Sequence, residues 1–231
     1  VCWGIIKGDL VAALNLAWRA NSQHLHLINT ASIILLPKKE DPNQLTDFRP
    51  ISLIHSFAKI LTKILELRLA PRMDELIGPA QSAFIRRRRI QENFLYIQGV
   101  VKKLHRSKTP AMLLKIDIAK AFDTVSWEFL LDLLRHLGFG ARWRDCVSTL
   151  LFTSSTTVTM NGRDTQRIRL AWGLRQGDPL SPLLFVLVME AFVALCTTVA
   201  RRSAFSPLAT DSLPLRASMY ADDTIIFFHP S

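Results

Sequence analysis

Cysteine is scarce in this 231-residue chain and follows no metal-binding or disulfide pattern. The three cysteines, Cys2, Cys146 and Cys196, are widely separated, and no two of them have CxxC spacing. The sequence therefore argues against a zinc site and against a disulfide framework. It also has no internal repeat and no low-complexity segment, and no signal-peptide pattern opens it. Because its first residue is valine rather than methionine, we expect the sequence to be a fragment.

Acidic residues are also few. Asp and Glu number 19 against 29 Lys and Arg, which gives a formal charge of +10. This surplus favours a polyanionic partner, because bound Lys and Arg side chains release counterions from phosphates. An anionic membrane surface would also suit a basic chain. The hydrophobic content of 49% is that of a globular protein.

A long uninterrupted apolar segment is missing as well. The longest apolar run, residues 183–200, contains Glu190 and is marginal in length for a membrane span. We interpret it as a buried core helix and expect no membrane partner.

Apolar spacing and turn residues predict a mixed set of helices and strands. In the first half we expect helices over residues 1–20, 52–72 and 90–106, a strand over 31–37 and a polar loop over 38–47. In the helix over 1–20 the predicted apolar face consists of Leu10, Ala13, Leu14, Ala17 and Trp18.

The second half is predicted to contain more strands. Strands are expected over residues 111–118, 215–220 and 224–228, a hairpin over 156–170, and helices over 127–137 and from 181 onward. Ser126 is a suitable N-cap for the helix over 127–137, Gly138 a suitable stop, and the apolar side includes Phe129. The hairpin turn is Asn161-Gly162, a pair typical of type I′ turns. These elements predict an α+β fold with a boundary near Pro110.

Three aspartates follow or separate apolar strands. Asp222 and Asp223 lie between two β-prone segments, and Asp117 ends another. Aspartate is also an ordinary turn former, so the doublet alone is ambiguous. If the strands are neighbours, the three carboxylates converge and need cations. Mg²⁺ prefers such oxygen ligands, and a pair of ions suits in-line nucleotidyl transfer.

Two further features fit a nucleotide site. Phe122 lies five residues after Asp117, where a ring beneath a sugar would clash with a 2′-hydroxyl; the alternative is a core aromatic beside Trp127. Residues 173–182 combine two glycines with the start of a helix, which favours anions, and Gln176 lies among them. The alternative for this segment is an ordinary loop.

Five motifs occur in a fixed order: FRPISL at 48–53, QSAFI at 81–85, KIDIAKAFD at 115–123, GLRQGDPLSP at 173–182 and YADD at 220–223. Together they closely resemble the reverse transcriptase of LINE-type, non-LTR retrotransposons, and most of all the plant members. The resemblance covers nearly the whole chain from about residue 33.

The resemblance implies a right-hand polymerase whose antiparallel palm sheet packs on helices. It divides the chain into an N-terminal helical extension (1–30), fingers (31–110) and a truncated palm (111–231). We expect the thumb to be absent, because the sequence ends eight residues after Asp223. Processive synthesis by residues 1–231 alone is therefore expected to be weak or missing.

The resemblance also implies residue roles. The metal-binding acids would be Asp117, Asp222 and Asp223, with two Mg²⁺ ions, or Mn²⁺ in their place. Phe122 would be the sugar gate, and Gln176 and Gly177 would line the nucleotide and template pair. Arg49, Lys59 and Arg88 would face the triphosphate or the template backbone. The implied partners are an RNA template, a DNA primer and deoxynucleoside triphosphates.

The unbroken arginine run departs from the family pattern. The family usually has glycine before the arginine that aligns with Arg88, but this chain has Arg87 there. The run Arg86, Arg87, Arg88 and Arg89 is a candidate nucleic-acid contact or a solvated basic loop.

Two alternatives remain open. RNA-dependent RNA polymerases usually have Gly-Asp-Asp and an acid at the position of Phe122, so DNA synthesis is favoured over RNA synthesis. A non-catalytic nucleic-acid-binding remnant of a mobile element would also explain the basic charge.

Overall fold

The structure is a computed structural model that describes residues 2–19, 24–160, 162–201 and 217–229. The chain forms two compact units, each built from two segments. Unit 1 consists of Val1–Glu66 and Phe122–Ser181, and unit 2 consists of Leu67–Ala121 and Pro182–Ser231. The compact units therefore do not follow the sequential division at 30 and 110. The assignment of those stretches to fingers and palm stays a prediction.

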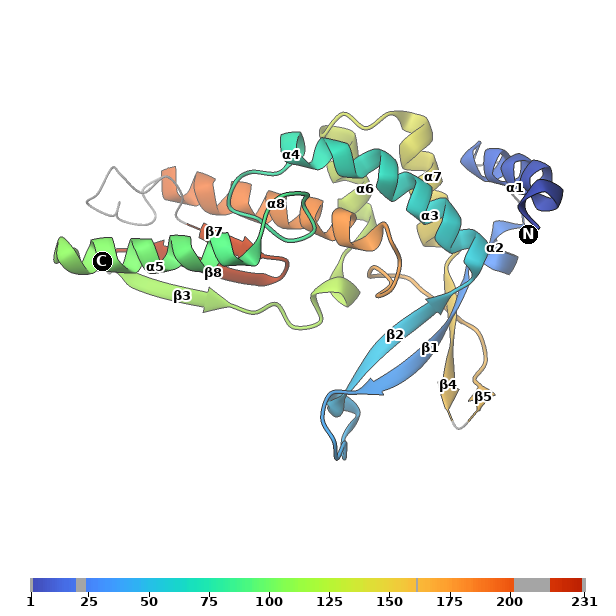
Figure 1. Ribbon diagram of the computed structural model, residues 1–231, viewed down its shortest axis with the longest axis horizontal. Helices are drawn as coiled ribbons and strands as arrows, with labels where there is room; N and C mark the ends of the chain where they lie inside the picture. The colour runs from blue at the N-terminus through green and yellow to red at the C-terminus, as the bar shows by residue number, and fades with distance from the viewer. Residues whose placement is uncertain (1, 20–23, 161, 202–216, 230–231) are drawn as a thin grey trace. The chain divides into compact units, whose positions relative to one another are not determined.

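Unit 1 contains a mixed sheet (Figure 1). Strands β1 (Thr30–Pro37) and β2 (Phe48–Ile54) form an antiparallel hairpin, and β1 also pairs in parallel with β4 (Ser155–Met160). Strand β4 pairs in turn with the two short strands β5 (Arg163–Asp164) and β6 (Ile168–Arg169). The hairpin predicted over 156–170 is thus present, whereas Asn161 lies outside the described residues.

Five helices belong wholly or mainly to unit 1 among the described residues: α1 (Trp3–Trp18), α2 (Leu25–Ile28), α3 (Ser56–Leu69), α6 (Trp127–His136) and α7 (Ala141–Phe152). In α1, only the five residues of the predicted apolar face are not fully exposed. This face packs near α7, which itself packs against α6. The amphipathic reading of the N-terminal segment is therefore confirmed.

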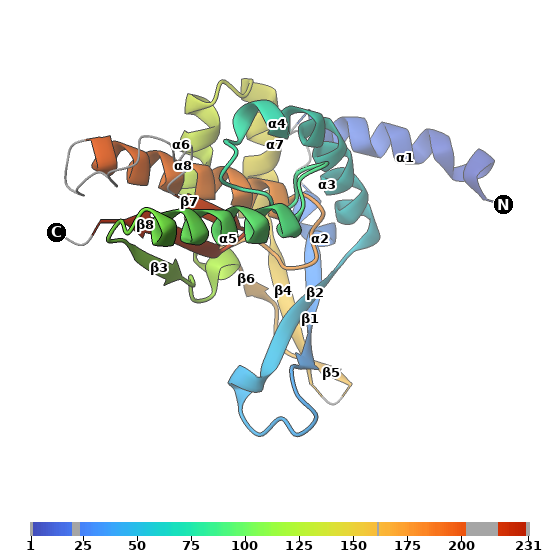
Figure 2. The same ribbon diagram turned by 60° about the vertical axis from the view of Figure 1, so that its left-hand side comes forward.

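Unit 2 contains a three-stranded antiparallel sheet in the order β3 (Met112–Ile116), β8 (Asp223–Phe228), β7 (Ala217–Tyr220). Helix α5 (Ile90–Arg106) covers it, as Figure 2 shows. Val100 and Leu104 of α5 are buried together with Phe227 of β8. The short α4 (Met73–Leu76) and the long α8 (Ser181–Arg201) complete the helices described for this unit. An α+β fold with a sheet packed on helices is confirmed.

Helix α8 has the length and apolar composition of a membrane span over residues 181–198. Its first turns are nevertheless buried, including Leu184, Phe185 and Leu187. These buried side chains agree with the interpretation of the apolar run as a core helix. No other helix in the described part of the chain meets the length and composition of a span.

Several local expectations differ from the structure. The helix expected from residue 52 begins at Ser56, because residues 52–54 pair with β1 as part of β2. Proline at position 50 concealed this strand, and it is tolerated there because β2 is a sheet edge. Helix α7 was not predicted, and Phe129 is exposed rather than covered. By contrast, α5 has the predicted bounds, and Ser126 caps α6 by accepting the Phe129 N–H.

Candidate active site

The sheet of unit 2 places the predicted acids at one end of neighbouring strands. Strands β3 and β8 pair from Met112 opposite Phe228 to Ile116 opposite Thr224. Asp117 directly follows the last of these pairs, and Asp223 directly precedes it along β8. Asp222 lies beside Asp223 in the two-residue turn between β7 and β8. The backbone register therefore brings the three positions together.

A lysine shares this end of the sheet. Lys115 Nζ lies 3.2 Å from Asp223 Oδ1, and both side chains are more than half exposed. Asp117 follows the last residue of β3 and lies two positions after Lys115. An exposed ion pair of this kind contributes little stability, at most about 1 kcal/mol. The ammonium partly neutralises the carboxylates but does not hold Asp223 firmly.

The donor set suits a hard divalent cation by its chemistry, since Asp117, Asp222 and Asp223 offer only carboxylate oxygens. Asp117 and Asp223 are exposed and Asp222 is half-buried, so solvent and an ion can reach them. Within the described residues, no group of three or more Asp, Glu, His or Cys side chains is arranged closely enough to hold a metal ion. The convergence of the carboxylates therefore stays a prediction.

A buried glutamine braces the turn that carries the doublet. Gln81 is 1% exposed. Its Nε2 donates to the Ala221 carbonyl at 3.2 Å, and its Oε1 accepts the Ala221 N–H at 2.9 Å. Ala221 has a positive φ of 55°, a conformation that a non-glycine residue needs support to keep. In the sequence, the signal for a role of Gln81 is limited to its place in the QSAFI motif.

The segment containing Gln81 runs alongside β7. The Met219 N–H donates to the Ala80 carbonyl at 2.7 Å, and the Ser82 N–H donates to the Met219 carbonyl at 3.1 Å. Asn93 of α5 donates through Nδ2 to the same carbonyl at 2.7 Å. These bonds tie β7, and with it the turn, to the first part of unit 2.

The four arginines differ in their surroundings. The Arg88 guanidinium donates to the carbonyls of Ile77, Gly78 and Gln81 and pairs with Asp74 at 3.3 Å. Its side chain is thus engaged within its own loop, which does not favour a contact with template or triphosphate. Arg86, Arg87 and Arg89 are exposed. The contact of this run with nucleic acid stays a prediction.

Arg87 has a φ of 66°, in the left-handed region that favours glycine. The family resemblance implied a glycine at this position. The structure explains why: the loop turns there in a conformation that a Cβ disfavours.

In unit 1 the proposed sugar gate meets the glycine-rich loop. The Leu174 N–H donates to the Phe122 carbonyl at 2.7 Å. Trp127 Nε1 donates to the Gly173 carbonyl at 2.7 Å. A Cβ on Gly173 would lie 2.7 Å from the Asp123 carbonyl oxygen, so only glycine allows this approach. The loop at Gly173 is therefore packed closely against the backbone of residues 122–123.

The other end of this loop lies against β2. The Ser52 N–H donates to the Gln176 carbonyl at 3.0 Å, and a Cβ on Gly177 would lie 2.8 Å from the Ser52 carbonyl oxygen. Gln176 is half-buried and Gly177 is exposed. Arg49 of β2 and Lys59 of α3 are both exposed, and neither side chain has a polar partner within the described ranges. The roles assigned to these four residues stay predictions.

A buried ion pair, which spacing along the sequence did not predict, anchors the same loop. Arg175 and Asp178 approach to 3.5 Å with both side chains buried, and Arg175 also donates to Asn29 Oδ1 at 2.7 Å. Burial raises the pKa of the Asp178 carboxyl, and the charge of Arg175 opposes that rise. Asp178 in turn accepts the Leu180 N–H at 2.9 Å, beside the start of α8. The pair fixes the loop in place rather than contacting a ligand.

Comparisons with known proteins agree with the order of motifs. The family model described as "Reverse transcriptase (RNA-dependent DNA polymerase)" matches residues 36–230. The transposon TX1 uncharacterized 149 kDa protein of Xenopus laevis is 30% identical over 97% of this chain. A Pol polyprotein from the R2 retrotransposable element of Popillia japonica is 28% identical over 83% of it. The chain spans only 17% and 26% of these two proteins.

Solved structures with the same fold include telomerase. The structure of telomerase from Candida albicans, in complex with a TWJ fragment of telomeric RNA, superposes with a TM-score of 0.59. It covers 91% of this chain and 39% of the telomerase chain, at 14% identity. This similarity concerns the fold alone, and it agrees with the polymerase architecture that the motifs implied.

Proposed function

We propose that this chain, which belongs to the reverse transcriptase (RNA-dependent DNA polymerase) family and has relatives among non-LTR retrotransposon proteins, extends a DNA primer on an RNA template. Deoxynucleoside triphosphates are the substrates, and the primer 3′-hydroxyl is the nucleophile. The reaction is nucleotidyl transfer, in which the hydroxyl attacks the α-phosphate and pyrophosphate leaves.

Asp117, Asp222 and Asp223 would hold two Mg²⁺ ions, with Mn²⁺ as a substitute. When bound, such ions stabilise the charge on the attacking and leaving oxygens. The chain's own contribution is to present the three carboxylates at one sheet end and to brace their turn through Gln81. Lys115 can leave Asp223 at little cost because the ion pair is exposed.

The nucleotide would bind against the loop at 173–177 and Phe122. The ring of Phe122 would exclude a 2′-hydroxyl, and Gln176 and Gly177 would line the base pair. Arg49 and Lys59 would face the triphosphate, which their exposure and freedom from ion pairs support. Arg86, Arg87 and Arg89 would contact the template backbone.

The observation that carries this proposal is the β3–β8 register, which sets Asp117 beside the Asp222-Asp223 turn. A direct test is a Mn²⁺ titration. Binding is measured as the loss of the free-ion signal in electron paramagnetic resonance. Asp117→Asn and Asp222→Asn should each weaken binding roughly tenfold or more. The same variants should abolish any primer extension on an RNA template.

The matched control is Asp132→Asn, which removes an exposed carboxylate from α6 in unit 1. It should leave Mn²⁺ binding and extension at the level of the parent chain. Parent-like Mn²⁺ affinity in both active-site variants would contradict the metal assignment. Where the parent chain extends a primer, extension by Asp222→Asn at the same rate would contradict the catalytic assignment.

A second candidate function is nucleic-acid binding without catalysis. The charge of +10 and the lysine paired with Asp223 favour it. It predicts RNA binding by the parent chain together with no Mn²⁺ site that depends on Asp117 or Asp222. The same titration therefore separates the two functions.

A further inference from the structure

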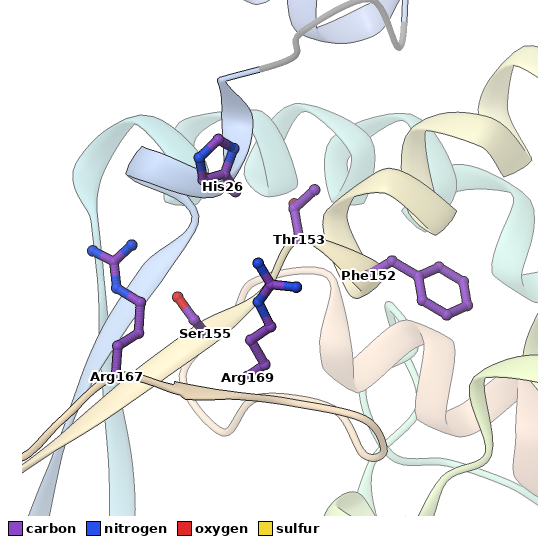
Figure 3. Close-up of a pocket in the computed structure, with 6 residues that line it drawn as sticks. All are labelled: His26, Phe152, Thr153, Ser155, Arg167 and Arg169. Carbon is purple, nitrogen blue, oxygen red and sulfur yellow. The ribbon is translucent and has the colours of Figure 1, made fainter.

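Unit 1 contains a cavity of about 240 Å³ that includes none of the residues assigned above. Its lining comes from α2, from the end of α7 and the residue after it, from β4, and from β6 and the residue before it (Figure 3). The lining residues are His26, Phe152, Thr153, Ser155, Arg167 and Arg169. We call it the β4–β6 pocket.

Strand pairing explains why these side chains gather. Ser155 of β4 lies directly opposite Arg169 of β6, so the two side chains share a face of the sheet. Arg167 directly precedes β6, and Figure 3 shows its side chain on the same side as that of Arg169. Figure 3 shows both guanidinium groups turned toward the side of the pocket where His26 lies, with the Ser155 hydroxyl between them.

The Ser155 hydroxyl has no hydrogen-bond partner among the described residues. Ser155 is 3% exposed, and its Oγ is buried without a hydrogen bond to any described residue. The neighbouring Thr153 hydroxyl, by contrast, donates to the Thr149 carbonyl at 2.6 Å and accepts from Asn29 at 2.9 Å. A buried hydroxyl normally has a partner, because leaving it unpaired costs about 1–3 kcal/mol. Ser155 Oγ is thus available to a ligand in the pocket.

The charged residues of the lining indicate an anionic ligand. The lining contains two arginines and a histidine but no acidic residue. Neither the Arg167 nor the Arg169 guanidinium makes an ion pair or a hydrogen bond within the described part of the chain. Two neighbouring guanidinium groups repel each other unless an anion lies between them. Guanidinium forks match phosphate oxygens, to which a serine hydroxyl can also donate.

We propose that the β4–β6 pocket binds backbone phosphates of a single-stranded nucleic acid. A continuous chain suits the site better than a small enclosed ligand, because both arginines are exposed. Phe152 at its edge is 62% exposed and offers a ring for base stacking. The choice of nucleic acid rests on the proposed function and on the basic charge of the chain. The pocket gives that function a binding site formed by unit 1 alone.

The test is the salt dependence of binding to a single-stranded RNA oligonucleotide, measured by fluorescence anisotropy. The double variant Arg167→Gln/Arg169→Gln should lower the slope of log K against log salt by about 1.4, since each phosphate contact on a single strand contributes about 0.7. The control Lys7→Gln/Arg142→Gln changes the net charge equally on exposed positions of unit 1. Its slope should remain that of the parent. Equal slopes for the two double variants would overturn the proposal.

Ser155→Ala provides a second, milder variant. Because the hydroxyl has no protein partner, the melting temperature should not fall, whereas RNA binding should weaken. Thr156→Ala, which removes a hydroxyl bonded to the Ala31 carbonyl, should lower the melting temperature instead. Parental RNA affinity in folded Ser155→Ala would count against the site.

Further titrations distinguish a nucleic acid from other phosphate ligands of the pocket. Inorganic phosphate or a deoxynucleoside triphosphate, titrated at constant ionic strength, should stabilise the parent and the arginine variant equally. Stabilisation of the parent alone, with an unchanged RNA slope, would overturn the proposal in favour of a free phosphate ligand. A phosphoserine peptide that bound better than RNA would overturn it in favour of a protein partner.

These results are independent of catalysis. Asp222→Asn should bind RNA as the parent does, because the acid is not in the pocket. If the pocket variants bind RNA normally while Asp222→Asn loses Mn²⁺, the pocket proposal fails and the polymerase proposal stands. If Asp222→Asn keeps Mn²⁺ binding while the pocket variants lose RNA binding, the polymerase proposal fails and the pocket proposal stands.

Discussion

Arg87 stores backbone strain in the loop that precedes α5. At its φ of 66° the Cβ lies too close to the following carbonyl oxygen, a steric cost that glycine would not have. Its neighbour Arg88 leaves the loop little freedom, because its guanidinium bonds three carbonyls. The loop therefore keeps its shape despite the unfavourable residue.

Arg87→Gly should accordingly raise the free energy of unfolding, by about 1 kcal/mol. The measurement is urea denaturation at constant ionic strength. Arg86→Gly removes the same charge at a position without positive φ, so it should bring no gain. A stability of Arg87→Gly at or below that of Arg86→Gly would show that the conformation is not strained.

At the scale of the element, the β7–β8 turn depends on support from a distant segment. Gln81 and Ala221 are 140 residues apart, yet the amide of one pairs with both backbone groups of the other. The turn consists of two residues and contains an alanine with a positive φ, so its conformation depends on these hydrogen bonds from Gln81. Gln81 therefore acts as a positioning residue for the acids.

Gln81→Met keeps the size of the side chain and removes three hydrogen bonds, the two to Ala221 and the one that Gln81 Oε1 accepts from the Ala83 N–H. It should cost about 1–3 kcal/mol of stability, because the Ala221 N–H and carbonyl lose their buried partner. It should also weaken Mn²⁺ binding, a readout that a merely structural glutamine would not move. Gln98→Met on the exposed side of α5 is the control and should change neither quantity. Unchanged Mn²⁺ affinity in folded Gln81→Met would remove the positioning role.

At the scale of the whole molecule, a half-buried carboxyl in α8 links stability to pH. Glu190 of α8 lies close to Gly78, whose Cβ, if present, would be 3.0 Å from Glu190 Oε1. Burial raises the pKa of the Glu190 carboxyl, and the Gly78 N–H and the charge of Arg88 only partly oppose the rise. The folded chain thus binds this proton more tightly than the unfolded chain does.

The free energy of unfolding should therefore gain from Glu190 as the pH falls from neutral through its raised pKa toward the usual value near 4.5. Glu190→Gln should remove that gain. At neutral pH the variant should have the higher free energy of unfolding, and the difference from the parent should shrink as the pH falls. Urea denaturation across this range measures the difference. Glu75→Gln, at an exposed carboxylate, should show no such trend. A constant difference between parent and Glu190→Gln would contradict the linkage.

Local sequence determined the elements whose signals are complete within a short window. Helix α5 has its predicted bounds, α6 has its predicted cap, and the apolar face of α1 is the predicted one, because each depends on periodicity and capping over a few turns. The family also followed from the ordered motifs, whereas the metal-binding role of the three acids stays a prediction. The motif pattern also marks position 87 as unusual, and its positive φ gives the reason.

Tertiary structure alone decided the features that depend on pairing between distant segments. Strand β2 exists in spite of its proline because β1 offers it an edge, and Gln81 matters because it meets a turn far along the chain. The arginines at 167 and 169 became a candidate site only when the β4–β6 register set them beside an unpartnered serine. Spacing along the chain encodes local conformation, whereas register between strands is set by contacts that no short window contains.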